Sequence, residues 1–158
     1  MFEKMHKKLA FAGAAALTAA GLSYAATRLM VKVAFDRELP EVKKIASDRI
    51  SGSDKDPEFE AARNSAAEAL ENTPHEKIEI FADDGVKLAG RLFQCENADR
   101  IIIAFHGWRS SWSRDFAMIS DFLNKSRCSV LYAEQRGQND SGGEYMGFGL
   151  TERLDCRA

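Results

Sequence analysis

The segment from Ile101 to Ala133 constrains the fold most, because its hydrophobic pattern changes period twice. Ile101–Phe105 is an unbroken apolar run, Ser113–Ser126 carries apolar residues at helical spacing, and Ser129–Ala133 is a second short apolar run. An apolar run without alternation is typical of a strand buried on both faces of a sheet. Two such strands joined by a helix predict a right-handed βαβ unit and therefore a parallel pair of strands.

The residues before this unit predict an antiparallel start to the same sheet. Lys77–Ala82 alternates between polar and apolar residues, Asp83-Asp84-Gly85 is a turn sequence, and Val86–Phe93 is extended again. Asp-Gly between two such runs indicates a β-hairpin. Upstream, Asp56-Pro57 predicts the start of a helix over Glu58–Glu71. The predicted fold class is α/β, with an antiparallel hairpin followed by parallel strands and a crossover helix.

A long uncharged segment lies near the N-terminus. No charged residue occurs in the 19 positions from Leu9 to Thr27, whereas lysines precede this run and Arg28 follows it. At about 1.5 Å per residue, such a helix nearly matches the ~30 Å hydrocarbon core of a bilayer. We interpret it as a single-pass signal anchor that binds the membrane through residues 9–27, because apolar residues continue beyond Arg28. The alternatives are a signal peptide cut near Ser23-Tyr24-Ala25, followed by secretion, and a helix of a soluble protein. Basic residues flank both ends, so the orientation stays open.

Charge and cysteine usage exclude several classes of function. The net charge of −2 and the pI near 6.0 give no basic surface for nucleic acid, so no nucleic-acid partner is expected. Cys95, Cys128 and Cys156 lie far apart and form neither a CxxC pair nor a cluster with histidines. The sequence therefore indicates no metal site and no disulfide framework.

Two polar loops follow the two predicted parallel strands. The first begins at His106-Gly107-Trp108 and the second runs from Glu134 to Gly143. Functional residues in such sheets gather at the carboxyl ends of the strands. We therefore expect the two loops to lie side by side and to form the candidate site.

The order of these elements resembles the first half of the α/β-hydrolase core. That core has a strand ending in His-Gly-x, a helix, a strand, and then an acid-x-Arg-Gly-x-Gly-x-Ser loop. IIIAFHGW and LYAEQRGQNDSGGEYMGFG are most similar to the serine aminopeptidase-like, lysophospholipase-like branch, which includes bacterial members with an N-terminal membrane segment. The resemblance covers about Lys77 to the C-terminus. The expected domains are a signal anchor or transmembrane segment in 1–35, a linker in 36–57, and an incomplete α/β-hydrolase domain, the N-terminal part of the sheet, in 58–158.

The resemblance also implies roles for residues of the first loop. In the family this loop supplies a backbone N–H of the oxyanion hole, and the corresponding donor here is the amide of Trp108. His106 and Gly107 would shape the turn. A fixed amide dipole at a developing negative charge is worth roughly 3 kcal/mol. We expect His106 to be a hydrogen-bonded structural residue and not the catalytic base.

The second loop is expected to support the first. Glu134, Arg136, Gly137 and Ser141 match the family's pattern, and Arg136 is expected to pair locally or with carbonyls at the end of the sheet. Asn139 stands where the family has its second glycine. Asn tolerates a left-handed backbone better than most residues, so the turn is expected to persist.

The residues that would carry out catalysis are missing from this sequence. An α/β-hydrolase presents its serine in a G-x-S-x-G elbow, followed along the chain by an acid and a histidine. No G-x-S-x-G occurs in the 158 residues, and the histidines are His6, His75 and His106. Ser141 lies in a sequence like the Gly-Asp-Ser-Gly-Gly of trypsin-like proteases, but without that fold or its upstream partners.

Two classes of function remain. The resemblance implies serine-dependent hydrolysis of a small ester, peptide or other acyl substrate by the full-length form, without a cofactor. The present chain would stop before the nucleophile and be inactive alone. The alternative is a non-catalytic, membrane-anchored interaction protein or the relic of an enzyme.

Overall fold

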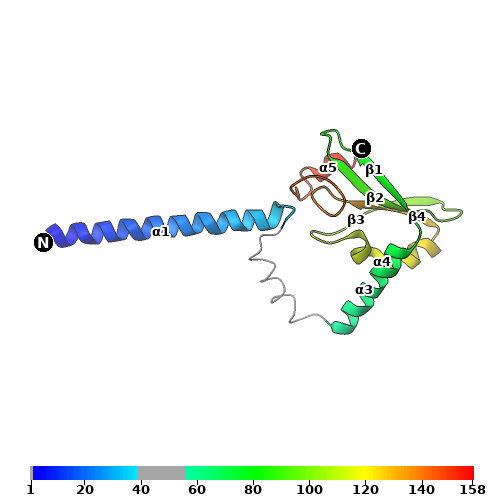
Figure 1. The fold of residues 1–158 in the computed structure, drawn as a ribbon, viewed down its shortest axis with the longest axis horizontal. Coiled ribbons are helices and arrows are strands. Elements are labelled where there is room, and N and C mark those ends of the chain that lie inside the picture. Colours follow the sequence, from blue (N-terminus) through cyan, green and yellow to red (C-terminus); the bar gives the residue numbers. More distant parts are fainter. Residues whose placement is uncertain (1, 39–55) are drawn as a thin grey trace.

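The computed structural model describes residues 2–38 and 56–158 and consists of a long N-terminal helix and a mixed α/β domain. Helix α1 (Phe2–Phe35) projects away from the body that holds the sheet (Figure 1). The rest of the expected linker, 39–55, lies outside the described residues. Helix α3 (Pro57–Asn72) begins where the sequence predicts, because the Asp56 side chain accepts a hydrogen bond from the amide of Glu58 at 3.0 Å.

The sheet has four strands in the order β1-β2-β4-β3. The hairpin strands β1 (Glu76–Phe81) and β2 (Lys87–Phe93) are antiparallel, and β2 also pairs antiparallel with β4 (Cys128–Glu134). Strand β3 (Arg100–Phe105) is parallel to β4, and helix α4 (Trp112–Lys125) connects them. This arrangement confirms the predicted fold class of an antiparallel hairpin followed by a parallel βαβ unit.

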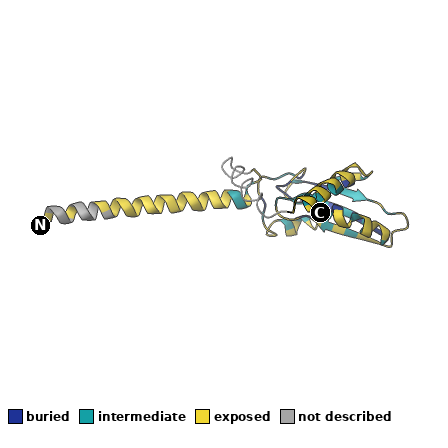
Figure 2. Cartoon of the chain, turned by 90° about the horizontal axis from the view of Figure 1, so that it is seen from below, coloured by how far each residue is buried: buried dark blue, intermediate teal, exposed yellow. Residues whose placement is uncertain are grey.

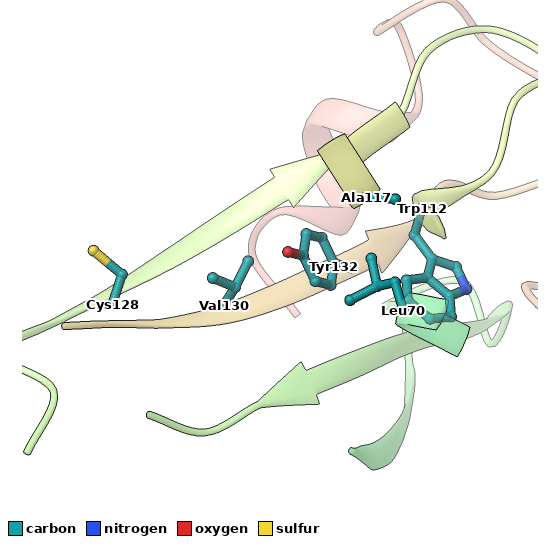
Figure 3. Close-up of a cluster of buried hydrophobic side chains, with 6 residues drawn as sticks. All are labelled: Leu70, Trp112, Ala117, Cys128, Val130 and Tyr132. Atoms are coloured by element: carbon teal, nitrogen blue, oxygen red, sulfur yellow. The ribbon is translucent and has the colours of Figure 1, made fainter. Parts of the chain in front are cut away.

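The hydrophobic core lies between one face of the sheet and helices α3 and α4. Figure 3 shows its buried side chains, which are Leu70, Trp112, Ala117, Cys128, Val130 and Tyr132. Strand β4 lies between two neighbours, and its residues alternate between buried and half-buried. Tyr132 stacks on the rings of Trp112 and Phe116 and is the centre of this cluster.

The prediction that Ile101–Phe105 is buried on both faces of the sheet is wrong for the described chain, because one face of this strand is exposed. Ile101, Ile103 and Phe105 are 61%, 56% and 45% exposed. The reason is that β3 forms the edge of the sheet, and the helices cover the face that carries Ile102 and Ala104. The other face of the strand keeps its apolar side chains open to solvent.

Helix α1 is the one described helix that is long and apolar enough to cross a membrane, over Gly13–Phe35. None of this segment is buried in the protein, and Figure 2 shows it exposed except for half-buried residues at the end nearest the domain. Length and composition do not separate a membrane anchor from a signal sequence, so both remain predictions.

Candidate active site

The two predicted loops lie next to each other at one edge of the sheet. In the parallel pair, Phe105 of β3 is in register with Ala133 of β4, so both strands end at the same level. Four hydrogen bonds join the loops directly, one of them between the side chains of Asn139 and His106. The other three run from Gln135 Nε2 to His106 O (2.5 Å), from the Arg109 amide to Gln138 Oε1 (2.7 Å), and from Asn139 Nδ2 to Ser110 O (3.0 Å). The structure therefore brings together the two segments that the sequence singled out.

His106 is buried and uses both of its ring nitrogens within these loops. Its Nδ1 is 2.9 Å from the carbonyl oxygen of Gly107, and its Nε2 is 3.2 Å from Nδ2 of Asn139. Because the Asn139 amide group donates, Nε2 accepts, and the ring hydrogen is assigned to Nδ1, which donates to Gly107. The geometry is that of a side chain that shapes the turn.

The turn that contains Trp108 is tied to the start of helix α4. The carboxylate of Asp115 accepts the Gly107 amide at 2.6 Å and the Ser110 hydroxyl at 2.5 Å. Asp115 lies in the first turn of α4, where the helix dipole favours a negative charge. Sequence reasoning missed Asp115 and Gln138. An acidic residue in the first turn of a helix, such as Asp115, is a recognisable sign of a group that can accept nearby backbone amides.

Trp108 lies half-exposed in the middle of this turn. Its indole N–H donates to the carbonyl of Ala34 in α1 at 3.1 Å, and the Arg109 guanidinium lies 5.3 Å from its ring centre. The contacts of the neighbouring residues fix the backbone of the turn. The role of the Trp108 amide as an oxyanion donor stays a prediction.

The second loop is built around buried polar groups. Ser141 is fully buried, and its hydroxyl donates to the Glu134 carbonyl at 2.7 Å and accepts from the Ala89 amide at 2.9 Å. The Glu134 carboxylate accepts the Asp140 amide at 2.7 Å and lies 3.5 Å from Arg91. Ser141 thus fastens the loop to strand β2, and its oxygen does not face solvent.

Arg136 connects three separate segments of the chain. Its guanidinium forms ion pairs with Asp84 in the hairpin turn, at 2.7 Å, and with Asp155 in the short helix α5 (Glu152–Asp155). These carboxylates, Asp155 foremost, raise the pKa of Arg136 further above its ordinary value. The hydrogen bond from Arg136 lowers the pKa of the Asp84 carboxyl. Arg136 pairs with distant carboxylates, where the sequence suggested local groups or sheet-end carbonyls.

Three residues of the second loop, Gly137, Asn139 and Gly143, have positive φ angles. Asn139 has φ of +47°, as expected for a residue that replaces a glycine. Gly137 has φ of +70°, and a Cβ there would lie 2.5 Å from the carbonyl oxygen of Tyr145. The Gly137 position therefore requires a residue without a side chain.

The end of α1 contacts both loops, which the sequence did not suggest. The Arg37 guanidinium donates to the carbonyls of Ser141 and Asn139 at 2.6 and 2.5 Å. Arg109 of the first loop in turn donates to carbonyls at the end of α1, those of Val33 and Asp36, at 2.9 and 2.5 Å. Asp36 also forms an isolated β-bridge with Tyr145. Residues 36 and 37, expected to begin a linker, are thus bound to the candidate site.

No group of three or more metal-ligating side chains is placed to hold an ion in residues 2–38 and 56–158. The cysteines Cys95, Cys128 and Cys156 are free thiols.

Comparison with known proteins gives only partial matches. No protein-family model and no curated protein matches this chain. Among solved structures, an esterase of Pyrococcus furiosus is 33% identical over 54% of this chain and 33% of its own, with a TM-score of 0.48. An α/β-hydrolase from a Penicillium species is 24% identical over 45% of this chain and 25% of its own, with a TM-score of 0.39.

This chain spans about a third or less of the length of the solved structures it matches. Because the TM-scores lie below 0.5, we infer chemistry from the two loops and not from these neighbours. One of these neighbours is an esterase and another an α/β-hydrolase, and for this chain the superfamily and the branch within it stay predictions.

Proposed function

We propose that this chain forms the oxyanion-side part of a membrane-anchored serine hydrolase that cleaves an ester or amide bond. The observation that carries the proposal is the pairing of the two loops at the carboxyl ends of β3 and β4. In parallel sheets this edge is where substrates bind. The serine aminopeptidase-like, lysophospholipase-like branch is the part of the superfamily that we propose.

In this proposal the first loop stabilises charge. When a nucleophile attacks the scissile carbonyl, its oxygen becomes negative, and the Trp108 amide donates a hydrogen bond to it. His106 and Asp115 act through the backbone, because their contacts to Gly107 and its neighbours fix the direction of the amides. A turn fixed before the reaction needs no reorganisation during it, which is the source of its catalytic benefit.

The second loop and α1 hold this turn in place. Arg136, Gly137 and Ser141 connect the second loop to the rest of the domain, and Gln138 receives the amide of Arg109. Helix α1 is proposed as the signal anchor. The serine, acid and histidine would come from a part of the full-length protein outside these 158 residues.

A second candidate function has support from the open face of β3. Ile101, Ile103 and Phe105 are exposed on an edge strand, and exposed apolar edges bind other chains readily. A non-catalytic, membrane-anchored interaction protein would use this edge and would have no need of the fixed turn.

Labelling with a fluorophosphonate probe separates the two functions. An antibody raised against residues 56–158 would recover the protein from its native membranes for reaction with the probe. We expect a labelled band larger than the 17.5 kDa of this chain, and no label on the recombinant 158-residue chain. Recovered protein that takes up no probe in either form would contradict the hydrolase and favour the interaction protein.

A further inference from the structure

Three aromatic side chains gather where helix α1 meets the candidate site. The ring centroids of Phe35 and Phe148 are 5.2 Å apart in an edge-to-face arrangement, and those of Trp108 and Phe148 are 6.2 Å apart. We call Phe35, Trp108 and Phe148 the aromatic cluster. They are 38%, 48% and 58% exposed, so the cluster is packed within itself and still faces outward.

Specific contacts hold the turn that carries Phe148, whose ring lies at the surface. Phe148 has φ of +49°, a conformation that bulky residues rarely adopt. The carboxylate of Glu152 accepts the amides on both sides, from Gly147 at 2.5 Å and from Gly149 at 2.9 Å. A buried core does not require this arrangement, because Phe148 contributes to none of the packing in the hydrophobic cluster between the sheet and its helices.

The cluster continues directly from the membrane-length helix. Phe35 is the last residue of α1, and its carbonyl accepts the amide of Met146 at 2.7 Å. The carbonyls at the end of α1 have no partner within the helix and need donors. The Trp108 indole N–H supplies one to Ala34, and the Arg109 guanidinium supplies others to Val33 and Asp36. Wherever the end of α1 lies, the aromatic cluster and the first loop lie with it.

Aromatic residues with a polar atom are favoured where a bilayer meets water. The apolar side chains of α1 are exposed from Gly13 to Val31, and Val33 and Ala34 at its end are half-buried, so most of this segment has an apolar surface that the protein itself does not cover. Basic residues near its end, Arg28 and Lys32, suit the headgroup layer. In the aromatic cluster, the indole of Trp108 suits the same layer, and the rings of Phe35 and Phe148 add apolar surface beside it.

We propose that the aromatic cluster rests in the interfacial layer of a phospholipid bilayer, so that both loops of the candidate site lie at the membrane surface. This inference rests on the membrane anchor in the proposed function but does not require the hydrolase activity. The bound partner is the lipid layer, contacted through Trp108 and Phe148 beside the end of α1.

Depth-dependent quenching of tryptophan fluorescence tests this contact. Trp108 and Trp112 are the two tryptophans of the chain, so Trp112→Phe leaves Trp108 as the single reporter. The full chain is reconstituted into phosphatidylcholine vesicles that contain lipids brominated near the headgroup or deep in the acyl chains. We expect shallow bromines to quench Trp108 several-fold more strongly than deep ones, and aqueous iodide to quench it weakly.

Two further variants distinguish a failure of the membrane anchor from a failure of the interfacial contact. Tyr24→Trp, with Trp108 and Trp112 both replaced by Phe, reports on the middle of the membrane-length segment Gly13–Phe35 and is expected to be quenched by deep bromines. Strong iodide quenching of Trp108 together with deep quenching at position 24 would overturn the interfacial contact and leave the anchor intact. Iodide quenching at both positions would overturn the anchor and the contact together. If Trp112→Phe impairs folding, the quenching of Trp108 is obtained instead by subtracting the fluorescence of Trp108→Phe from that of the wild type.

Discussion

The two loops of the candidate site are built in opposite ways. The loop around Trp108 exposes its central side chain and is fixed mainly through its backbone amides, which donate hydrogen bonds to the side chains of Asp115 and Gln138. The loop around Ser141 buries its polar side chains and ties them to other segments through hydrogen bonds and ion pairs. One loop therefore has a fixed backbone beside an exposed side chain, and the other connects separate segments of the domain.

Substitutions in the second loop should therefore affect stability most. The largest effect is expected for Arg136→Met, which leaves the nearly buried Asp155 carboxylate without its cation. Removing one partner of a buried pair costs about 3 kcal/mol in the free energy of unfolding. Urea denaturation of the full chain in detergent measures this change. Arg100→Met, which breaks an exposed pair with Asp99, is the control and should cost less than about 1 kcal/mol. Equal effects at both positions would show that Arg136 is not the connection we describe.

The next largest effect is expected at Gly137. Gly137→Ala places a Cβ 2.5 Å from the Tyr145 carbonyl oxygen at a φ of +70° and should destabilise the domain by about 2 kcal/mol. Gly85→Ala is the matched control, because Gly85 has a similar φ of +81° but no atom near its Cβ position. That control should lose only the strain energy, about 1 kcal/mol. The difference between the two melting temperatures isolates the contact with Tyr145, and no difference would contradict the close approach.

Ser141→Ala tests whether this serine is structural. The substitution leaves the Ala89 amide without its acceptor inside the protein and should cost about 1 to 2 kcal/mol. Ser120→Ala removes only a hydroxyl that bonds within helix α4, and its cost should stay below about 0.5 kcal/mol. Probe labelling of the full-length protein should survive Ser141→Ala. Loss of labelling with unchanged stability would mean that Ser141 is the nucleophile after all.

The smallest effect is a dependence of stability on pH. The hydrogen bond from Arg136 lowers the pKa of Asp84 below its ordinary 3.8, so the folded protein holds this proton less tightly than the unfolded chain does. The resulting stabilisation is present above about pH 4 and is lost as the pH falls through the lowered pKa. The gap in melting temperature between wild type and Asp84→Asn should therefore shrink from pH 6 to pH 3. A gap that stays constant, or one that also appears with Asp83→Asn, would contradict this ion pair.

Periodicity was sufficient to predict the elements of the fold. The strand pattern, the cap at Asp56 and the order of hairpin and βαβ unit follow from local residue chemistry, whereas the left-handed conformation of Asn139 was expected from the family resemblance. The exposure of β3 could not be predicted this way. An apolar run shows that a strand forms, but its burial depends on which segments pack against it.

The long-range contacts of the site were also beyond local reasoning. Arg136 pairs with residues 52 and 19 positions away, and Arg37 reaches a carbonyl 104 positions away. No spacing in the sequence encodes such pairs, because they depend on how the loops meet in the folded structure. Family resemblance located the two loops correctly, but Asp115 and the end of α1 appeared only in three dimensions.

The meeting of the two loops around His106 is tested most directly by NMR of the ¹⁵N-labelled chain in detergent micelles. We predict that the His106 ring carries its hydrogen on Nδ1 and shows a nuclear Overhauser effect to the side-chain amide of Asn139, which lies 3.2 Å from Nε2. A ring protonated on Nε2 alone, with no contact to Asn139, would contradict the account.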